Sequence, residues 1–439
     1  MLGAGRTVST PHRIAAVAQA SFGALMVLAL GCSPIAAPTI SAPELLAPAA
    51  PGASPQTAQP SPPRAVSPTT KRDDSRLEVP VRGFRVSDDD GSRRARVTSK
   101  HVAAWVGIAN RIFAPAGFVL RFDASRGLEE LRSTTINHAM PDRRLPQLDE
   151  ALGPVLDRHR GELVVLFRHG PAAEPSAVAF SGLYLDYIVM PGFEGTHHCG
   201  QDQLDALAHE LGHFLGLPHT FVKSFETKGA AEVFLRTHGG EPSAFDGDGI
   251  ADTPPDPGIA TMECSDATTV ELAGVPFELP RSNLMSYYEQ RRTLSPTQIE
   301  RARWVMGERV ATGMTIPVNA PARPLELETM AAVGPRTCRN QSMSSFLDHR
   351  WSGNHQQFCT DPSRFRFVLA TAGRYEVRLY ATRAPDFGQL QVAIDGRDLG
   401  RPFEAWAPVV LPSGPIVVGE AELDRGAHTV AFRVVGRHP

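Results

Sequence analysis

Short apolar runs mark the strands expected in the first half of the chain. Each run is rich in β-branched or aromatic residues and is bounded by turn-forming residues, which is the pattern of a buried or half-buried strand. Pro80 has no backbone N–H to give to a neighbour, so we expect the first strand to lie at a sheet edge. The runs lie at 77–86, 118–122, 163–167 and 183–190.

Helical spacing of apolar residues occurs between these runs. Apolar residues from Val102 to Ile112 recur every three or four positions, which predicts a helix capped by Ser99. A second helix is expected within 147–159, where Pro154 should break or kink it. Alternating helices and strands are typical of an α/β layer, so we expect a mixed α+β or α/β domain over 74–316.

The spacing changes after a proline-rich stretch at 317–324. Apolar and polar residues then tend to alternate, which predicts an all-β, jelly-roll-like sandwich over 325–439. Trp351, Trp406 and Tyr380 are candidates for stacking on sugar rings, and the alternative is that they belong to the core. The alternating runs lie at 365–369, 375–380, 390–394 and 429–434.

The N-terminus has the features of an export signal. Arg6 and Arg13 precede a short apolar run at 14–30. The run ends at Cys32 in a context that resembles a bacterial lipoprotein signal, so we expect a signal peptide over 1–32 and a lipid on Cys32. A plain secretory peptide is the alternative. In either case the protein is exported, to the cell envelope as a lipoprotein or as a secreted protein.

The segment 33–73 consists mostly of proline, alanine, serine and threonine. It has too little apolar surface to offset its ordering entropy, so it is expected to be a disordered linker. The formal net charge of the chain is −3, without a long basic run. We therefore expect no nucleic-acid partner, and contact with a membrane only through a lipid anchor.

Cysteine usage indicates an oxidising compartment. Besides Cys32, four cysteines admit three pairings, and closeness along the chain favours Cys199 with Cys264 and Cys338 with Cys359. The alternative for Cys199 is a free thiol that forms a second metal site with the neighbouring histidines at 197–198.

The stretch with the most specific chemistry is His209-Glu210-Leu211-Gly212-His213, followed by Gly216 and His219. On a helix, His209 and His213 lie one turn apart on one face, where two imidazoles can bind one ion. Gly216 can end the helix, and the turn then brings His219 back towards the same ion. Three imidazoles around Zn²⁺ leave a fourth position for water, which is the arrangement of a catalytic site.

This H-E-x-x-H-x-x-G-x-x-H pattern resembles the metzincin metalloprotease signature. Residues 283–287, Asn-Leu-Met-Ser-Tyr, are similar to the methionine turn of the pappalysin branch, and the resemblance covers roughly 77–308. It implies a mixed sheet with a zinc helix. It also implies that Glu210 is the general base, that Met285 packs beneath the metal, and that Tyr287 contacts the zinc site or the developing oxyanion.

The same resemblance implies two further features. It assigns the strand at 182–190 to peptide docking at the sheet edge, with an interior strand as the alternative. It also compares the acidic segment after the zinc motif with a D-G-x-x-D-T-P element that helps to bind Ca²⁺, with a solvated turn as the alternative. The calcium candidates are Asp248 and Thr253, followed by Asp246 and Asp252. A cysteine expected soon after Phe221 is missing.

These patterns together predict an exported zinc endopeptidase that hydrolyses peptide bonds in proteins. The alternative is a surface protein that binds a partner, such as a carbohydrate, through its sandwich, while the peptidase region is inactive or incidental.

Overall fold

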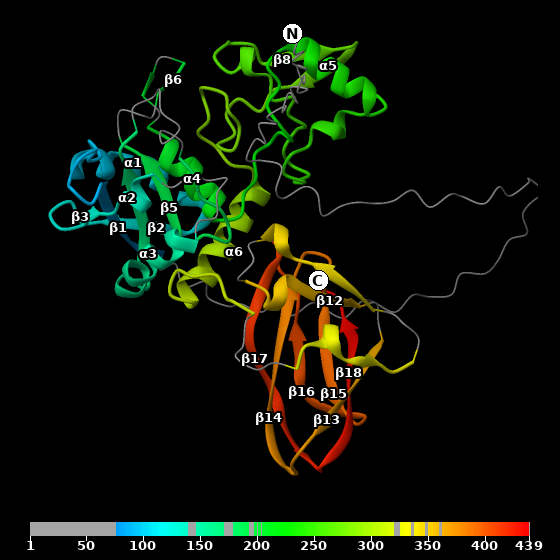
Figure 1. Cartoon of the computed structure of the whole chain (residues 1–439). Helices are drawn as coiled ribbons and strands as arrows, with labels where there is room; N and C mark the ends of the chain where they lie inside the picture. The colour runs from blue at the N-terminus through cyan, green and yellow to red at the C-terminus, as the bar shows by residue number, and fades with distance from the viewer. Residues whose placement is uncertain are drawn as a thin grey trace, which may run out of the picture.

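The computed structural model describes residues 76–138, 146–170, 179–192, 197–199, 201–202, 204–319, 325–334, 338–346, 350–359 and 362–438. The expected signal peptide, the linker and Cys32 lie outside these residues. The described chain forms an α/β region, a lobe of loops and short elements, and an elongated β-sandwich at the C-terminus (Figure 1). The described helices include none with the length and apolar character that a membrane span requires.

A parallel sheet lies at the centre of the first region. Its strands follow the order β2-β1-β4-β5, and β3 pairs with the second half of β1. Strand β4 is buried at every position, as expected for a strand with helices on both faces. The strands are β1 (Leu77–Ser87), β2 (Phe118–Phe122), β3 (Leu128–Arg132), β4 (Leu163–Arg168) and β5 (Tyr187–Pro191).

Helices cover both faces of this sheet. Trp105 of α1 belongs to a core on the face that carries Val165, and α4 packs on the same side. Leu152 of α3 belongs to a second core, on the face that carries Val164. The side chains of neighbouring β4 residues thus pack into different cores, because successive side chains of a strand point to opposite faces of the sheet. The helices are α1 (Ser99–Ile112), α2 (Thr134–Asn137), α3 (Pro146–Arg158) and α4 (Ala206–Phe214).

Two details at the start of the chain differ from the prediction. The first strand, β1, is interior and not at an edge. Pro80 is tolerated because pairing with β4 begins only at Val81, so no N–H is needed on that side. The cap of α1 is Thr98 and not Ser99, and the side chains of Thr98 and His101 form a capping box.

Two further elements also differ. Helix α3 continues through Pro154, because its apolar face, with Leu152 and Val155, is held in the core. The strand expected at 183–190 is shorter and begins only at Tyr187, since residues before it form a turn. The strand β3 was not predicted, because its sequence, Leu-Glu-Glu-Leu-Arg, has little β-propensity.

The chain between the zinc motif and the last helix forms a lobe with its own small core. This core includes Phe225, Leu235, Phe245 and Phe277. The helix that follows begins with the predicted capping box of Ser295 and Gln298. The elements are α5 (Lys228–Thr237), β8 (Thr269–Leu272), β9 (Val275–Glu278) and α6 (Pro296–Ala311), while the short β6 (His197–His198) and β7 (Gln201–Asp202) precede α4.

The C-terminal region is antiparallel, as predicted, but its sheets are unequal. One sheet has the order β10-β13-β18-β15-β16, the other contains β14 and β17, and β11 pairs with β12. All four predicted runs are strands. The strands are β10 (Ala331–Ala332), β11 (Cys338–Ser342), β12 (His355–Cys359), β13 (Ser363–Leu369), β14 (Gly373–Arg383), β15 (Gln389–Ile394), β16 (Arg397–Glu404), β17 (Leu411–Leu423) and β18 (Gly426–Gly436).

The two regions share an apolar core. Trp351, Val409 and Leu411 belong to the same buried cluster as α1 and α4. The hydroxyl of Tyr184 donates to the carbonyl of Val410. Because these side chains come from both sides of the proline-rich stretch, the sandwich is packed against the α/β region and is not merely tethered to it.

Candidate metal centre

The metal-binding pattern lies on α4 and on the turn that follows it. Just after α4, Gly216 takes the left-handed conformation with φ of 77°. The N–H groups of Gly216 and Leu217 donate to the carbonyls of His213 and Gly212, each at 2.9 Å. This pair of hydrogen bonds is a Schellman helix end. The chain reverses there, and His219 faces α4, as predicted.

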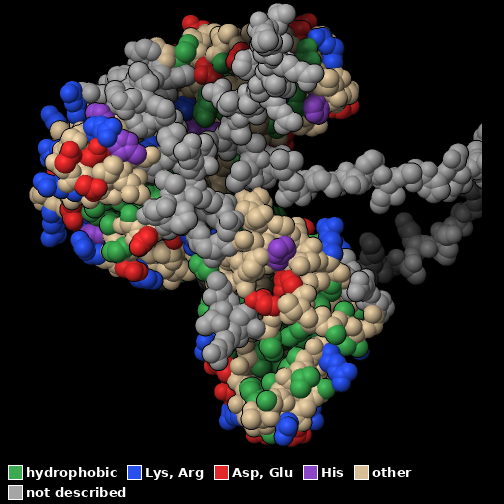
Figure 2. Space-filling model, viewed as in Figure 1, with side chains coloured by type: hydrophobic (Ala, Val, Ile, Leu, Met, Phe, Trp, Pro, Cys, Tyr) green, Lys and Arg blue, Asp and Glu red, His purple; other side chains and the backbone are tan. Residues whose placement is uncertain are grey.

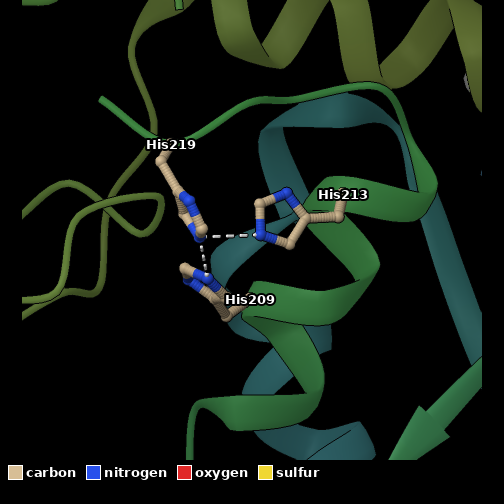
Figure 3. A group of neighbouring side chains, drawn as sticks. All are labelled: His209, His213 and His219. Carbon is tan, nitrogen blue, oxygen red and sulfur yellow. Dashed lines mark hydrogen bonds between the residues drawn. The ribbon is translucent and has the colours of Figure 1, made fainter. Parts of the chain in front are cut away.

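Three imidazoles converge at this point (Figure 3). Nε2 of His219 lies 3.2 Å from Nε2 of His209 and 3.0 Å from Nε2 of His213. Nitrogen atoms bound about 2.1 Å from a tetrahedral zinc ion are about 3.4 Å apart, so the spacing suits one shared ion. In the described parts of the chain, this is the one group of at least three His, Cys, Asp or Glu side chains placed to hold a metal.

Backbone carbonyls orient two of the rings. Nδ1 of His209 donates to the carbonyl of Leu284 at 2.7 Å, and Nδ1 of His213 donates to that of Leu217 at 2.8 Å. Because a carbonyl only accepts, the proton of each neutral ring lies on Nδ1 and the lone pair of Nε2 faces the site.

Burial also favours the neutral, metal-binding form of the rings. It lowers the pKa of His213 to about 4 and holds the pKa values of His209 and His219 well below the ordinary value. Protons therefore compete weakly with a metal ion at neutral pH.

Glu210 lies beside these ligands on α4 and is buried. Its Oε2 has no hydrogen-bond partner among the described residues. Burial raises the pKa of this carboxyl to about 7. A buried carboxylate oxygen without a partner requires an explanation. An ion and a water molecule in front of the three imidazoles provide one, so the residues fit a catalytic zinc site.

Met285 packs directly against the zinc helix, and it is fully buried. A Cβ atom added to Gly212 would lie 2.4 Å from Sδ of Met285, closer than two atoms can approach. Glycine at 212, inside the histidine motif, is therefore required by Met285. The neighbouring Leu284 carbonyl is the acceptor for His209, so the methionine turn also orients a ligand.

Tyr287 lies against the third ligand. Its ring centroid is 4.7 Å from that of His219 and 4.7 Å from that of Phe221. Burial raises the pKa of Tyr287 to about 12, so the hydroxyl keeps its proton. The residue is thus placed beside the candidate metal as a potential donor.

Two charged residues that support the site were not predicted. Arg291 is buried; its Nε donates to Asp205, the residue before α4, at 3.0 Å, and its Nη1 donates to the carbonyl of Ser286 at 3.3 Å. It therefore joins the zinc helix to the methionine turn. An arginine just after a methionine turn carries no sequence signal of this role.

Asp256 makes a similar connection and is fully buried. Its carboxylate accepts the hydroxyl of Thr220 at 2.6 Å, the hydroxyl of Tyr288 at 2.8 Å and the N–H of Gly258 at 2.9 Å. Thr220 follows the ligand His219, and Tyr288 follows Tyr287. The carboxylate therefore fixes these two segments relative to each other.

The acidic segment does not form a metal cluster in the described structure. Asp246 and Asp248 accept hydrogen bonds within their own turn, including that of the Thr253 hydroxyl to Asp248 at 2.7 Å. Asp252 accepts the hydroxyl of Ser295 at 2.6 Å and so supports the start of α6. The contacts of these residues lend no support to calcium.

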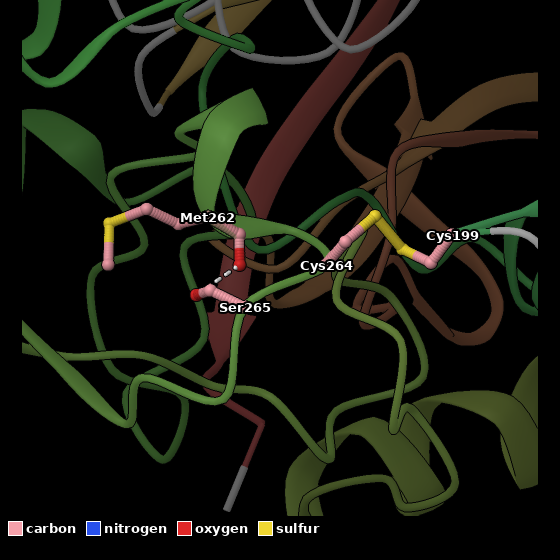
Figure 4. Close-up of a disulfide and its surroundings, with 4 residues drawn as sticks. All are labelled: Cys199, Met262, Cys264 and Ser265. Carbon is pink, nitrogen blue, oxygen red and sulfur yellow. Dashed lines mark hydrogen bonds between the residues drawn. A yellow bond between two sulfur atoms is a disulfide. The ribbon is translucent and has the colours of Figure 1, made fainter.

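Both predicted disulfides are present. Cys199 pairs with Cys264 (Figure 4), with Cα atoms 5.3 Å apart, and Cys338 pairs with Cys359 between β11 and β12. Since Cys199 is in a disulfide, the alternative of a free thiol at a second metal site is wrong. The first disulfide links the segment before α4 to the lobe that follows the histidine motif.

The expected docking strand at 182–190 lies at the end of the sheet order, as predicted and not in its interior, but it is shorter than predicted. Its second half is β5, which is buried, and the outer side of β5 is partly occupied because Phe180 and Val189 exchange backbone hydrogen bonds of 2.9 Å. The outermost described backbone at this side of the sheet is therefore that around Phe180. Ser181, next to it, donates to the backbone carbonyl of Glu210.

The three aromatic candidates in the sandwich differ in environment. Trp351 is buried, and its Nε1 donates to Thr382, so it is a core residue. Trp406 stacks on His438, with ring centroids 3.8 Å apart. Tyr380 is half-buried. None of these contacts indicates a sugar site.

The solved structures that match this chain include three with weak similarity. Xanthan lyase from Paenibacillus is 18% identical over 28% of this chain and 12% of that chain, with a TM-score of 0.24. Exo-β-1,3-galactanase from Phanerochaete chrysosporium is 19% identical over 25% of this chain and 24% of that chain, with a TM-score of 0.17. OgpA from Akkermansia muciniphila is 11% identical over 81% of this chain and 83% of that chain, with a TM-score of 0.28. These TM-scores are too low to establish a shared fold.

The protein-family comparison is informative. No curated protein matches the chain, but residues 172–307 match the model of peptidase family M43, described as Pregnancy-associated plasma protein-A. The matched segment contains the three histidines, the glutamate between them and the methionine turn. The chain therefore contains a pappalysin-like metallopeptidase region of the metzincin type.

Proposed function

We propose that this protein is an exported zinc endopeptidase that cleaves proteins or peptides. The observation that carries the proposal is the convergence of three Nε2 atoms beside the unpartnered Oε2 of Glu210. When bound by His209, His213 and His219, zinc supplies an acidified water and polarises the scissile carbonyl.

The remaining steps are carried out by side chains of the protein itself. Glu210 accepts a proton from the attacking water and passes it to the leaving amine. The Tyr287 hydroxyl donates a hydrogen bond to the oxyanion as it develops. The carbonyls of Leu284 and Leu217 hold the imidazoles in the required tautomer.

Mass spectrometry of peptide-library cleavage tests the proposal. We would incubate residues 73–439 with zinc and a proteome-derived peptide library, with Glu210→Gln as the matched control. Cuts made by the wild type alone, and lost on chelation, support the proposal. Zinc-loaded wild type that makes no cuts favours a binding protein with an inactive peptidase region.

Calcium and export are additional predictions. Ca²⁺ bound around Asp248 would have to replace the hydrogen bonds that this carboxylate now accepts within its own turn. Added calcium should therefore raise the unfolding temperature of the protein only if this turn changes conformation.

For export, acyl-modified Cys32 should be detected in the membrane fraction by mass spectrometry. A chain with a free N-terminus after Cys32, found outside the cell, would indicate a plain secretory signal.

A further inference from the structure

The two sheets of the sandwich differ in size, and this leaves apolar surface uncovered. Among the described residues, one sheet has five strands and the other has only β14 and β17, while the segments at 325–330 and 355–359 also line the space between them. Strands lie about 4.8 Å apart, so two strands cannot cover the inner face of five. Inward-facing Phe367, Val377, Leu379 and Phe432 are half-buried, and Val434 is 49% exposed.

An open cleft of about 1520 Å³ lies between the sheets. Hydrophobic side chains gather along the middle of the sandwich on the face shown in Figure 2. The floor of the cleft is formed by β13, β15 and β18, and one wall by β14. The volume exceeds the range of about 300–1,000 Å³ that is usual for small-molecule sites. The apolar lining includes Phe367, Leu369, Val377, Leu379, Val430 and Phe432.

An unpaired strand edge borders the same cleft. Strand β14 pairs with β17 along one edge, and no other described strand pairs with it. The other edge of an eleven-residue strand thus offers N–H and C=O groups to a further strand. Tyr375, Val377 and Leu379 alternate along β14 and line the cleft.

The cleft extends to the peptidase region. Glu300 of α6 lines it together with Trp406. Trp406 packs edge to face against Trp304 of α6, with ring centroids 6.3 Å apart, and Arg383 at the end of β14 donates to Glu308 at 3.0 Å. The cleft is therefore continuous with the interface between the two regions.

We propose that this cleft binds an extended segment of a protein substrate as an additional strand along β14. The proposal rests on the peptidase function proposed above. Alternate apolar side chains of the segment cover the floor, while its backbone pairs with the free edge of β14. A hydrocarbon would leave that edge unpaired, and a sugar would place hydroxyls against apolar walls. An extended polypeptide covers the apolar floor with its side chains and also forms backbone hydrogen bonds with the free edge of β14.

Binding to an inactive full chain tests the proposal without requiring catalysis. The probe is fluorescein-labelled, reduced and carboxymethylated α-lactalbumin, an unfolded polypeptide, and the protein is Glu210→Gln. Adding Val434→Glu, which places a charge in the cleft, should weaken binding at least about tenfold. The control Val368→Glu lies outside the cleft at a 68% exposed position and should stay within about twofold. Equal affinities of the two double variants would overturn the proposal.

Hydrogen exchange supplies a signature of strand pairing. The bound polypeptide should slow exchange of those backbone amides in β14, residues 373–383, that are not hydrogen-bonded to β17, and a charge at Val434 should remove this protection. Protection of these same amides without the probe overturns the proposal in favour of another occupant. A dimer by light scattering then identifies a second copy, and loss of protection on deleting residues 1–75 identifies the chain's own N-terminal segment.

A short substrate separates this proposal from the catalytic one. An eight-residue fluorogenic peptide has too few residues to occupy the zinc site and also pair along the eleven-residue β14. Cleavage of this peptide by the Val434→Glu enzyme should be unchanged, while cleavage of the unfolded protein should fall about tenfold. If the wild type cleaves neither substrate but still binds the probe with β14 protected, the catalytic proposal fails and the cleft proposal stands.

Discussion

The zinc site and the sandwich differ in how much free space surrounds their side chains. At the zinc site, the missing Cβ of Gly212 would lie 2.4 Å from Sδ of Met285. In the sandwich, inward-facing side chains border an open cleft of about 1520 Å³. Metal ligands must hold one geometry, so their support is closely packed. A surface that accepts varied polypeptides can leave its apolar face uncovered until a partner binds.

Separating the two regions should have the largest effect. A chain that ends at 319 loses Trp351, Val409 and Leu411 from the core that supports α4. Each buried side chain of this size contributes about 2–5 kcal/mol, so we expect the truncated chain to be unfolded or aggregated. Circular dichroism and zinc binding measure this. A truncated chain that unfolds at the same temperature as the whole protein would show that the regions are independent.

Replacement of the base should have the next largest effect. Glu210→Gln should lower kcat by about 10²–10⁴-fold, the usual contribution of general acid–base catalysis. Zinc content, measured by mass spectrometry of the native protein, should stay at the wild-type level because Glu210 is not a ligand. Full activity in this variant would remove Glu210 from the mechanism.

The same substitution should stabilise the metal-free protein at high pH. Burial raises the pKa of Glu210 to about 7 from an ordinary value of 4.5. Below pH 4.5 the carboxyl is neutral in both the folded and the unfolded protein, and its full contribution to the free energy of unfolding is present. This contribution is lost as pH rises from 4.5 through 7, because the unfolded protein releases the proton more readily than the folded protein. The loss is about 3 kcal/mol at pH 8. Urea unfolding of chelated protein should show that Glu210→Gln loses less stability between pH 4.5 and pH 8 than the wild type.

A matched pair of substitutions tests the difference in packing directly. Gly212→Ala should destabilise the protein by about 1–3 kcal/mol, since Met285 must move. Val430→Leu, which adds one carbon beside the cleft, should change stability by less than about 0.5 kcal/mol. Urea midpoints compare the two. Equal losses would mean that the sandwich is as tightly packed as the zinc site.

The smallest loss of metal binding is expected at Asp256. Asp256→Asn keeps the shape but places an amide against the Thr220 or Tyr288 hydroxyl, each of which now donates to the carboxylate. Changes behind metal ligands typically reduce metal affinity or activity by about 10–100-fold. We expect a loss near the lower limit, measured by competition with a zinc chelator. Tyr288→Phe, which removes one donor, should lose less.

The sequence predicts best those features that depend on residue type and on spacing along the chain. The histidine motif, the helix end at Gly216 and the disulfide partners follow from residue identity and distance along the chain. The supports from Arg291 and Asp256 do not, because their partners are set by tertiary packing. The interior position of β1 does not follow from Pro80, because the missing N–H of a proline excludes a neighbouring strand only where that strand pairs with the proline, and β4 pairs only from Val81 onward. The cleft does not follow from the sequence, because alternation of apolar and polar residues predicts strands but not how many strands each of the two sheets contains.

The order of synthesis gives the contact between the zinc helix and the sandwich a further consequence. The turn after α4 at Gly216 lies against Val409, and Tyr184 donates to Val410. These partners emerge from the ribosome about 190 residues after the histidine motif, at the slow pace of translation. We therefore expect the histidines to be held in place only once almost the whole chain has been made. A peptidase whose site forms last has less time to cleave proteins of the cell in which it is made.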